Sequence, residues 1–383
     1  MSSILDGVRA LTPTIRGRVD EIEVLGQIPA DLLERLTEAG CYRLHVPAAH
    51  GGLDVDLSTS MRALELLGSA DASVAWNVMT GCQAAPMLAL LEPATFDALY
   101  GCGPDLISTM ALSVKGTAVE TADGYRVKGR WPVASGSDQC VWLIANCMIL
   151  NEDGSARLVN GSPLVRVMVF PTADTALVER WHSSGLKGAG QHAVTVDDLF
   201  VPADRSFDLM EGEPRVRTAV SQLTLLSIYS CHIGAIALGV AAGAVRDIEE
   251  VMADSEGMAA IDDRRSDRLL TEHSLAQAGL TLRGAHELLY DMADRLSAFS
   301  AADQTVPLEA RIRAKATGSW VVAAAGSVVS TAYEIAGGAG LAHDHPLARR
   351  FRDVHALGQH GSLTQEHLTP AAAMLVSADL VRA

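Results

Sequence analysis

The chain has 383 residues, of which 49% are hydrophobic and 20% are charged, and its formal net charge is −16. This length and composition exclude a disordered chain and predict a globular protein with two or three layers or domains. The acidic balance disfavours nucleic acid and anionic membrane surfaces, so we expect neither as a partner.

Helical patterns fill the first hundred residues. Apolar residues recur at helical spacing over 28–39 and stop at Gly40. Further helical patterns cover 58–68, 73–91 and 93–101. These patterns predict a helical N-terminal domain over residues 1–105.

Strand patterns begin near residue 106. The Asp123-Gly124 pair predicts a turn beside a strand over 124–131. Further runs of strand-forming residues cover 141–149, 164–170 and 192–201. Short strands at this spacing predict a compact central β-domain over 106–205.

Long helical patterns return after Arg205. They cover 221–252, 266–299 and 307–336. These lengths exceed those of ordinary globular helices and are typical of a bundle. We therefore expect a C-terminal helical bundle over residues 206–383.

The six cysteines show no CxxC pair and no spacing typical of a zinc site. We therefore predict reduced, buried thiols and no metal site. No basic-then-apolar leader and no apolar run of eighteen residues is found, so we expect a cytoplasmic protein without a membrane partner.

The segment from Trp131 to Ser137 reads WPVASGS and follows a predicted strand. Gly136 lets the backbone approach a ligand closely, and Ser135 is a candidate to hydrogen-bond a planar heterocycle. A plain polar turn explains the same residues. The segment is therefore either a ligand loop or a turn.

Two glycine-rich segments allow the same two interpretations. The loop 184–191, with Gly188 near its centre, can present backbone N–H groups to a ligand. It does not open a helix, so a dinucleotide-binding fingerprint is disfavoured. The run GGAG, which begins with Gly337 and Gly338, ends a helix and can also cradle a ligand.

Arginines gather at two places. One group lies at the start of a long helical pattern, where it can meet phosphate or form a solvated charged face. The other group can form an ion-pair network. The first group is Arg264, Arg265 and Arg268, and the second is Arg349, Arg350 and Arg352.

Two histidines stand out in the segment ARRFRDVHALGQH over 348–360. His355 and His360 are five residues apart, which on a helix separates them by about 140°. We therefore expect one to pack or pair near Asp353 and the other to face a pocket. A histidine in a pocket can exchange a proton near neutral pH.

Three longer segments carry a family resemblance. They are GRWPVASGSDQCVW over 129–142, GLKGAGQHAVTVDDLFVP over 185–202 and GGAGLAHDHPLARRFRDVHALGQH over 337–360. Together they resemble the acyl-CoA dehydrogenase fold, and within it the two-component flavin-dependent monooxygenases. The resemblance extends over essentially the whole chain.

The resemblance implies an α+β fold, mainly α, with a helical N-terminal domain, a central β-domain and a C-terminal four-helix bundle, assembled as a homotetramer. A flavin, either FAD or FMN, would lie between the β-domain and the bundle and be completed by a neighbouring subunit. We assign cofactor binding to Trp131, Ser135, Ser137, Gly188, Gly337, Gly338, Arg264 and Arg265.

The last segment separates two branches of the family. Acyl-CoA dehydrogenases carry a catalytic glutamate a few residues after the Arg-Asp pair, whereas here the stretch 357–362 reads LGQHGS. Without a carboxylate, proton abstraction from an acyl thioester loses its base. The RDVHAxxxH pattern of the monooxygenases is present whole. The alternatives are an acyl-CoA dehydrogenase with a displaced base and a non-catalytic scaffold.

The monooxygenase resemblance implies that a separate NAD(P)H-dependent reductase supplies reduced flavin. O₂ would then form a C4a-hydroperoxide, and one oxygen atom would pass to a phenol- or indole-type substrate. His360 would deprotonate the substrate or steady the peroxide proton, and Ser135 would meet the flavin near its reactive nitrogen. The site would have to be dry.

Two departures from the family concern the pocket walls. The DASVAW stretch over 71–76 is present, but Cys82 and Gln83 occupy the region where several relatives place a histidine. The common Gly-Thr-Gly-Ser loop reads GAGQ over 188–191. We expect Trp76, Cys82 and Gln83 to line the substrate pocket, and we leave C-, N- and S-oxygenation open.

Overall fold

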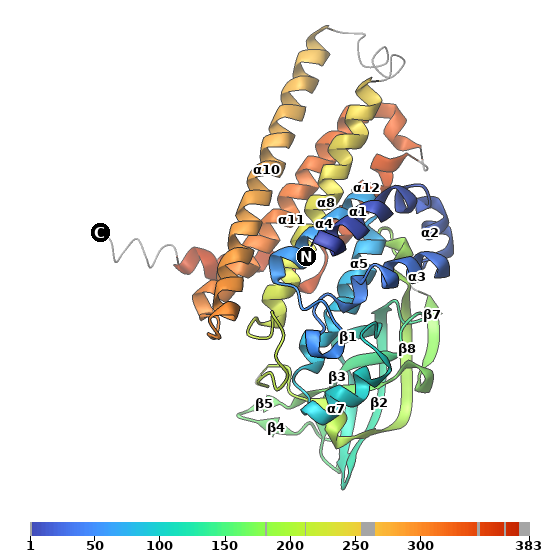
Figure 1. The fold of residues 1–383 in the computed structure, drawn as a ribbon, viewed down its shortest axis with the longest axis vertical. Helices are drawn as coiled ribbons and strands as arrows, with labels where there is room; N and C mark the ends of the chain where they lie inside the picture. The colour runs from blue at the N-terminus through green and yellow to red at the C-terminus, as the bar shows by residue number, and fades with distance from the viewer. Residues whose placement is uncertain are drawn as a thin grey trace, which may run out of the picture.

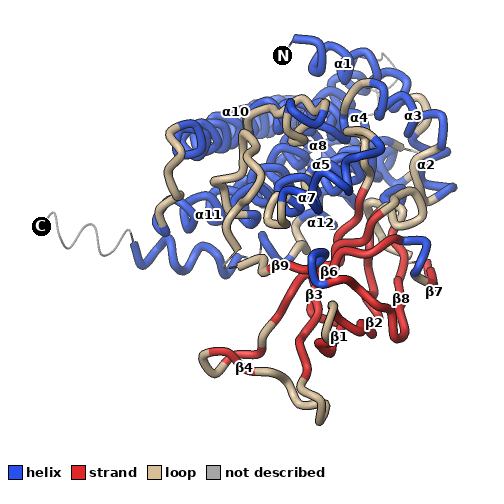
Figure 2. Tube along the Cα trace, turned by 60° about the horizontal axis from the view of Figure 1, so that its bottom comes forward, coloured by secondary structure: helices blue, strands red, loops and turns tan. Residues whose placement is uncertain are grey.

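The computed structural model describes residues 2–180, 182–210, 212–253, 265–342, 345–363 and 365–374. In this part of the chain, helices come first, a sheet follows, and long helices return (Figure 1). The sheet lies at one end of the molecule, and the helices gather on one side of it (Figure 2). The order of elements predicted from the sequence is confirmed.

The N-terminal helices are short and pack around a shared apolar core. They are α1 (Ser2–Arg16), α2 (Val19–Leu25), α3 (Ala30–Glu38), α4 (Leu57–Ala70), α5 (Ala72–Cys82), α6 (Ala84–Leu88) and α7 (Pro93–Leu99). Asp71 separates α4 from α5, because its backbone is extended and its carboxylate accepts the N–H of Val74 at 2.9 Å. Every residue of α5 is buried, so this helix lies at the centre of the molecule.

The seven-stranded sheet has the order β7-β8-β2-β1-β3-β6-β9. Its strands are β1 (Ser108–Thr121), β2 (Gly124–Ser135), β3 (Trp142–Leu150), β6 (Val165–Pro171), β7 (Ala176–Arg180), β8 (Gln191–Pro202) and β9 (Ser206–Phe207). All neighbours are antiparallel except β1 and β3, which run parallel. A small hairpin of β4 (Leu158–Val159) and β5 (Ser162–Pro163) projects from the sheet (Figure 2).

The C-terminal part contains three long helices that run side by side, α8 (Leu225–Ala253), α10 (Arg265–Ala301) and α11 (Leu308–Ala336), followed by α12 (Pro346–Leu357) (Figure 1). Helix α8 packs against α4, α10, α11 and α12. It is apolar and long enough to cross a membrane, but most of its apolar stretch is buried inside the protein. Its composition is therefore explained by its position in the core.

Several details differ from the sequence prediction. The pattern over 73–91 is split into α5 and α6 at Gln83. The helices α1 and α2 and the strand β1 were not predicted. The sheet ends with β9 at Phe207, two residues beyond the predicted boundary at 205/206. The division at 105/106 stays a prediction, with the last helical turn ending at Cys102 and the first strand starting at Ser108.

Candidate active site

His360 does not lie on a helix. Helix α12 ends at Leu357, and His360 follows in the turn after Gly358. The helical separation of about 140° between His355 and His360 was therefore a wrong premise. His355 is exposed and contacts Phe351 edge-on, with ring centroids 4.4 Å apart. A histidine was expected to pack or pair near Asp353. The carboxylate of Asp353 instead accepts a hydrogen bond from the backbone N–H of Leu186, with N and Oδ1 2.7 Å apart.

The ring of His360 is held between two aromatic side chains. It stacks on Tyr229 of α8, with centroids 5.5 Å apart and planes 11° apart, and meets Trp76 of α5 edge-on at 5.5 Å. Helices α5, α8 and α12 pack against one another, so three separate segments build this corner. Of the two histidines, His360 is the less exposed, and the prediction that it faces a pocket stays a prediction.

The hydrogen bonding of His360 defines its tautomer. The backbone N–H of Ser362 donates to Nδ1 at 3.3 Å, so Nδ1 carries a lone pair and the ring hydrogen is assigned to Nε2. Burial lowers the pKa of His360 to about 4. The ring is therefore neutral at physiological pH and presents an N–H donor.

Ser135 lies at the end of β2 and is buried. Its Oγ accepts a hydrogen bond from Nε1 of Trp76 at 3.1 Å, and its carbonyl accepts one from Oγ1 of Thr109. Within the described part of the chain, the hydroxyl hydrogen of Ser135 has no acceptor. Trp76 thus contacts both predicted catalytic residues. Its ring meets the ring of His360, and its Nε1–H donates to Ser135.

The two loops predicted to bind a ligand are joined to each other. Gly136 has a positive φ of 72°, and its N–H donates to the carbonyls of Ala189 and Gly190 at 2.9 and 2.8 Å. A Cβ at Gly136 would lie 2.9 Å from Nδ2 of Asn77, so the close approach requires glycine. The segments WPVASGS and GLKGAGQ are therefore hydrogen-bonded to each other, and they lie beside α5.

Other residues predicted to bind the cofactor form contacts with residues of the protein itself. The N–H of Gly188 donates to Oγ of Ser73 at 3.1 Å. Oγ of Ser137 lies 3.4 Å from Nδ1 of His192. Trp131 has no exposed surface, packs against Phe170 and donates its Nε1–H to the carbonyl of Asn146. Trp131 therefore supports the sheet beneath Ser135 and offers no surface to a ligand in this geometry.

The remaining predicted cofactor residues lie in other parts of the fold or outside the residues that the structure describes. Gly337 and Gly338 are exposed in the turn after α11. Arg264 lies outside the described residues, and of Arg265 only the backbone at the start of α10 is described. These four assignments stay predictions.

A pair of buried carboxyl groups fixes the glycine-rich loop. Asp353 of α12 accepts the N–H of Leu186, and Asp71 caps α5. Burial and then the nearby Asp71 raise the pKa of Asp353 to about 7, and burial raises the pKa of Asp71. Both carboxyl groups are therefore harder to ionise than exposed ones, although the positive charge of Arg349 acts in the opposite direction on each of them.

The predicted arginine network is confirmed in α12. Nε of Arg350 donates to Asp247 of α8 at 2.5 Å, with both side chains buried, and Arg352 pairs with Glu23 of α2 at 2.7 Å. Arg349 is farther from its partner Asp20, at 3.8 Å. These pairs tie the segment that carries His360 to the bundle and to the N-terminal helices.

Cys82 and Gln83 are fully buried, and their partners were not predicted. Their role as walls of a substrate pocket stays a prediction. Nε2 of Gln83 lies 2.8 Å from Nδ1 of His232 on α8. The ring of His232 stacks on His45, with centroids 5.5 Å apart. No sequence signal links residues 45, 82 and 232, because only the fold brings them together.

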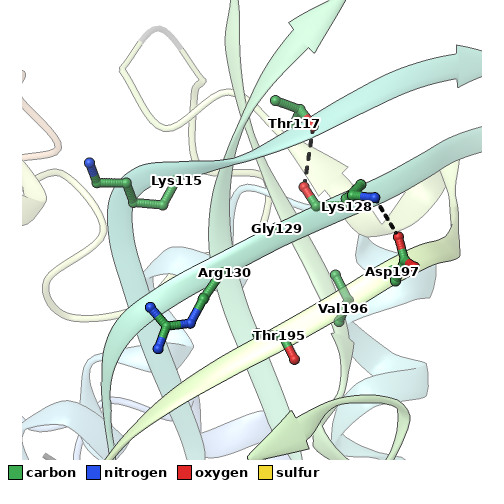
Figure 3. Close-up of a pocket in the computed structure, with 8 residues that line it drawn as sticks. All are labelled: Lys115, Thr117, Lys128, Gly129, Arg130, Thr195, Val196 and Asp197. Carbon is green, nitrogen blue, oxygen red and sulfur yellow. Dashed lines mark hydrogen bonds and ion pairs between the residues drawn. The ribbon is translucent and has the colours of Figure 1, made fainter. Parts of the chain in front are cut away.

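A separate hollow of about 450 Å³ lies over β1, β2 and β8 (Figure 3). Lys115, Lys128 and Arg130 reach into it, and Lys128 pairs with Asp197 at 2.9 Å. None of the residues around His360 lines this hollow. It was not predicted from the sequence.

Comparison with known families agrees with this geometry. The acyl-CoA dehydrogenase N-terminal domain matches residues 3–93, and the acyl-CoA dehydrogenase C-terminal domain matches residues 231–365. Together the two matches span more than half of the chain. The chain therefore belongs to the acyl-CoA dehydrogenase family. Within that family it is similar to oxygenase subunits of flavin-dependent monooxygenases.

Two curated relatives cover nearly the whole chain. The chain is 27% identical to the flavin-dependent monooxygenase oxygenase subunit HsaA of Rhodococcus jostii, over 92% of each chain. It is 25% identical to the indole-3-acetate monooxygenase of Pseudomonas putida, over 97% of this chain and 92% of that protein. Among solved structures, the 3-HSA hydroxylase from Rhodococcus sp. RHA1 matches with a TM-score of 0.87 and 26% identity, covering 99% of this chain and 96% of that one.

Proposed function

We propose that the protein is the oxygenase component of a two-component monooxygenase, which uses reduced flavin and O₂ to insert one oxygen atom into a small aromatic or heteroaromatic molecule. The observation that carries this proposal is the half-buried, neutral ring of His360, which contacts Tyr229 and Trp76 and is linked to Ser135 through Trp76. An acyl-CoA dehydrogenase would need a carboxylate base near this corner, and the chain has LGQHGS there.

The residues at this corner suit a flavin. Ser135 offers a buried hydroxyl whose hydrogen has no acceptor in the described chain, and a flavin ring supplies acceptors of that kind. Reduced flavin, when bound, would supply the two electrons that activate O₂, and O₂ would supply the oxygen atom that is transferred. Trp76 keeps the Ser135 hydroxyl in place through its Nε1–H. FAD and FMN both meet these requirements.

The aromatic walls also suit an aromatic substrate. Tyr229 and Trp76 can pack on a flat ring, and both are buried, which keeps water from the reacting groups. Nε2–H of His360 can donate a hydrogen bond to an oxygen atom that gains negative charge during the transfer. The structure's tautomer therefore favours His360 as a donor over the alternative role as a proton acceptor at Nε2.

The names of relatives agree with a phenol- or indole-type substrate. They include indole-3-acetate monooxygenase, p-hydroxyphenylacetate 3-hydroxylase and a resorcinol hydroxylase. Two of these names specify an oxygenase component, which supports a separate NAD(P)H-dependent reductase as partner of this chain. The proposal includes a cytoplasmic location and a homotetrameric assembly. Light scattering on the purified protein tests the number of subunits.

The deciding experiment supplies chemically reduced FAD or FMN to the protein in oxygenated buffer, together with a panel of phenols and indoles. We expect an oxygenated product that takes its new oxygen atom from ¹⁸O₂. Anaerobic reduction of bound oxidised flavin by an acyl-CoA, without any oxygenated product, would establish the dehydrogenase alternative. Failure to bind flavin in either redox state would establish the scaffold alternative.

Replacement of Ser135 tests its role at the flavin. In Ser135→Ala the fold is retained, but the hydroxyl that we propose to contact the flavin is lost. We expect a larger share of the reduced flavin to be consumed without product, so that H₂O₂ released per product rises several-fold. Peroxide and product are measured in the same reaction. An unchanged ratio would remove Ser135 from the mechanism, and Ser113→Ala at an exposed position of β1 serves as the control.

The pH dependence of product formation tests the environment of His360. Its pKa is lowered from 6.5 to about 4 by burial, so the ring stays neutral until the pH falls through about 4. With chemically reduced flavin, the rate should therefore remain level between about pH 8 and about pH 5.5 and decline only below that range. A decline centred near pH 6.5 that is absent from a His360→Gln variant would contradict this assignment.

A further inference from the structure

A second polar cluster lies behind the aromatic corner, in the core between α5, α8 and the turn that precedes α4. It consists of His45, Cys82 and His232, all without exposed surface. One ring nitrogen of each histidine and the sulfur of the cysteine lie within 4.8 Å of one another. Soft sulfur and imidazole nitrogen at this spacing form a set of transition-metal ligands.

Hydrogen bonds determine which nitrogen of His232 is free to bind. The hydroxyl of Ser60 donates to the carbonyl of Leu57 at 2.8 Å, so its oxygen accepts from Nε2–H of His232 at 2.9 Å. Nδ1 of His232 therefore carries the lone pair, and it faces the amide of Gln83 at 2.8 Å. A histidine that binds a metal through one nitrogen characteristically donates the other N–H to an oxygen in this way.

The other groups in the cluster lack partners. Neither ring nitrogen of His45 has a well-formed hydrogen bond, although the backbone of Val55 is close, and Oε1 of Gln83 has none. Both residues have no exposed surface. Buried polar groups without partners are costly, and a shared ligand is one way to satisfy them.

We propose that this cluster is a zinc site, in which Zn²⁺ is bound by His45, Cys82 and Nδ1 of His232, with Oε1 of Gln83 in the fourth position. Zinc binding requires the thiolate, so the Cys82 proton is released to solvent and no electron is transferred. Hard cations such as Mg²⁺ prefer oxygen ligands and do not suit this set. Tetrahedral zinc with bonds of about 2.0–2.3 Å requires the three ligand atoms to close by roughly 1 Å and the Gln83 amide to turn.

The position of the cluster indicates what the ion would do. Tyr229, which stacks on His360, lies one helical turn before His232 on α8. Cys82 ends α5, which also carries Trp76. A bound ion would therefore cross-link α5 and α8 directly behind the two aromatic walls and hold them at a fixed separation. The inference rests on the cluster alone and is independent of the proposed oxygenase activity.

The proposed site differs from the prediction of no metal site, which was based on cysteine spacing along the chain and stays a prediction until metal is measured. That prediction considered CxxC pairs, whereas these ligands come from three segments that only the fold brings together. The prediction of buried thiols is confirmed for five of the six cysteines and is wrong for Cys102, which is exposed. Cys231 is the neighbour of His232 and is equally buried, but it belongs to another core cluster and serves as the matched control.

Metal analysis of the full-length protein tests the inference. We expect about one zinc per chain by plasma mass spectrometry after expression in zinc-supplemented medium and gel filtration. Cys231→Ser should retain this zinc, whereas Cys82→Ser and His45→Gln should lose at least about nine-tenths of it. Wild-type protein with less than about one-tenth of a zinc per chain would overturn the site, as would undiminished zinc in the two ligand variants.

Cobalt provides a readout that does not depend on the folding of any variant. Wild-type protein expressed with Co²⁺ in place of zinc should show a thiolate-to-cobalt absorption band and tetrahedral d–d bands. Absence of both bands in cobalt-loaded wild-type protein would refute the thiolate ligand. Failure of the wild-type protein to bind either metal would likewise show that the zinc site is wrong.

Discussion

Product formation should fall by about 100-fold or more in His360→Ala, while flavin binding is retained. The reason is that the imidazole is the neutral N–H donor at the aromatic corner, and a positioned acid, base or donor contributes roughly 10²–10⁴-fold to a rate. Alanine removes this donor and leaves the walls Tyr229 and Trp76 in place. The measurement is product formed per reduced flavin consumed, together with the dissociation constant of the flavin.

His355→Ala is the matched control, because His355 lies in the same segment but is exposed and packs against the ring of Phe351. We expect its product yield to remain within about two-fold of wild type. If His360→Ala keeps wild-type coupling of O₂ to product, the role of His360 is refuted. If it loses flavin binding altogether, His360 is a cofactor-binding residue and the donor role is wrong.

The second large effect is on stability. Arg350→Ala should lower the free energy of unfolding by roughly 3 kcal/mol, because it leaves the carboxylate of Asp247 buried without its main partner. The carbonyl of Ser69 also loses a donor, 3.1 Å away. Arg16 and Arg246 lie 3.6 and 3.8 Å from the same carboxylate, which places the loss at the low end of the range for buried pairs.

Two comparisons isolate the cause of this destabilisation. Arg295→Ala breaks an exposed pair with Asp291 and should cost less than about 0.5 kcal/mol. Arg350→Met combined with Asp247→Leu removes both charges and should recover most of the loss. Denaturant midpoints of the four proteins provide the measurement. Equal costs for Arg350→Ala and Arg295→Ala would show that the buried pair contributes no more than a surface pair.

The sequence predicted the elements whose periodicity is strong. The long apolar patterns of α8 and α11 and the strand runs of β3 and β6 were found within a few residues of their ends. Strand β1 was missed because its second half carries lysine, glycine and threonine and residues 113–115 and 120–121 are exposed, so the apolar alternation is weak. Helix α1 was missed because Pro13 interrupts its pattern near the C-terminal end.

The candidate site was predicted in part. His360 and Ser135 were identified by motif, and the fold does connect them, but the connecting residue Trp76 was expected only as a pocket wall. The orientation of His360 was not predictable from helical geometry, because α12 ends three residues earlier. His45 and His232 lie in no motif, and contacts between segments nearly two hundred residues apart leave no periodic signal.

The hydrogen bond from Leu186 to Asp353 has a mechanical consequence. It joins the glycine-rich loop to α12 across 167 positions of sequence, and both atoms are buried. If the loop were displaced while α12 stayed in place, a peptide amide and a carboxyl group would each lose a partner in the dry interior, at a cost of several kcal/mol. The loop and α12 are therefore expected to move together, so that any shift of the loop also shifts the turn that carries His360.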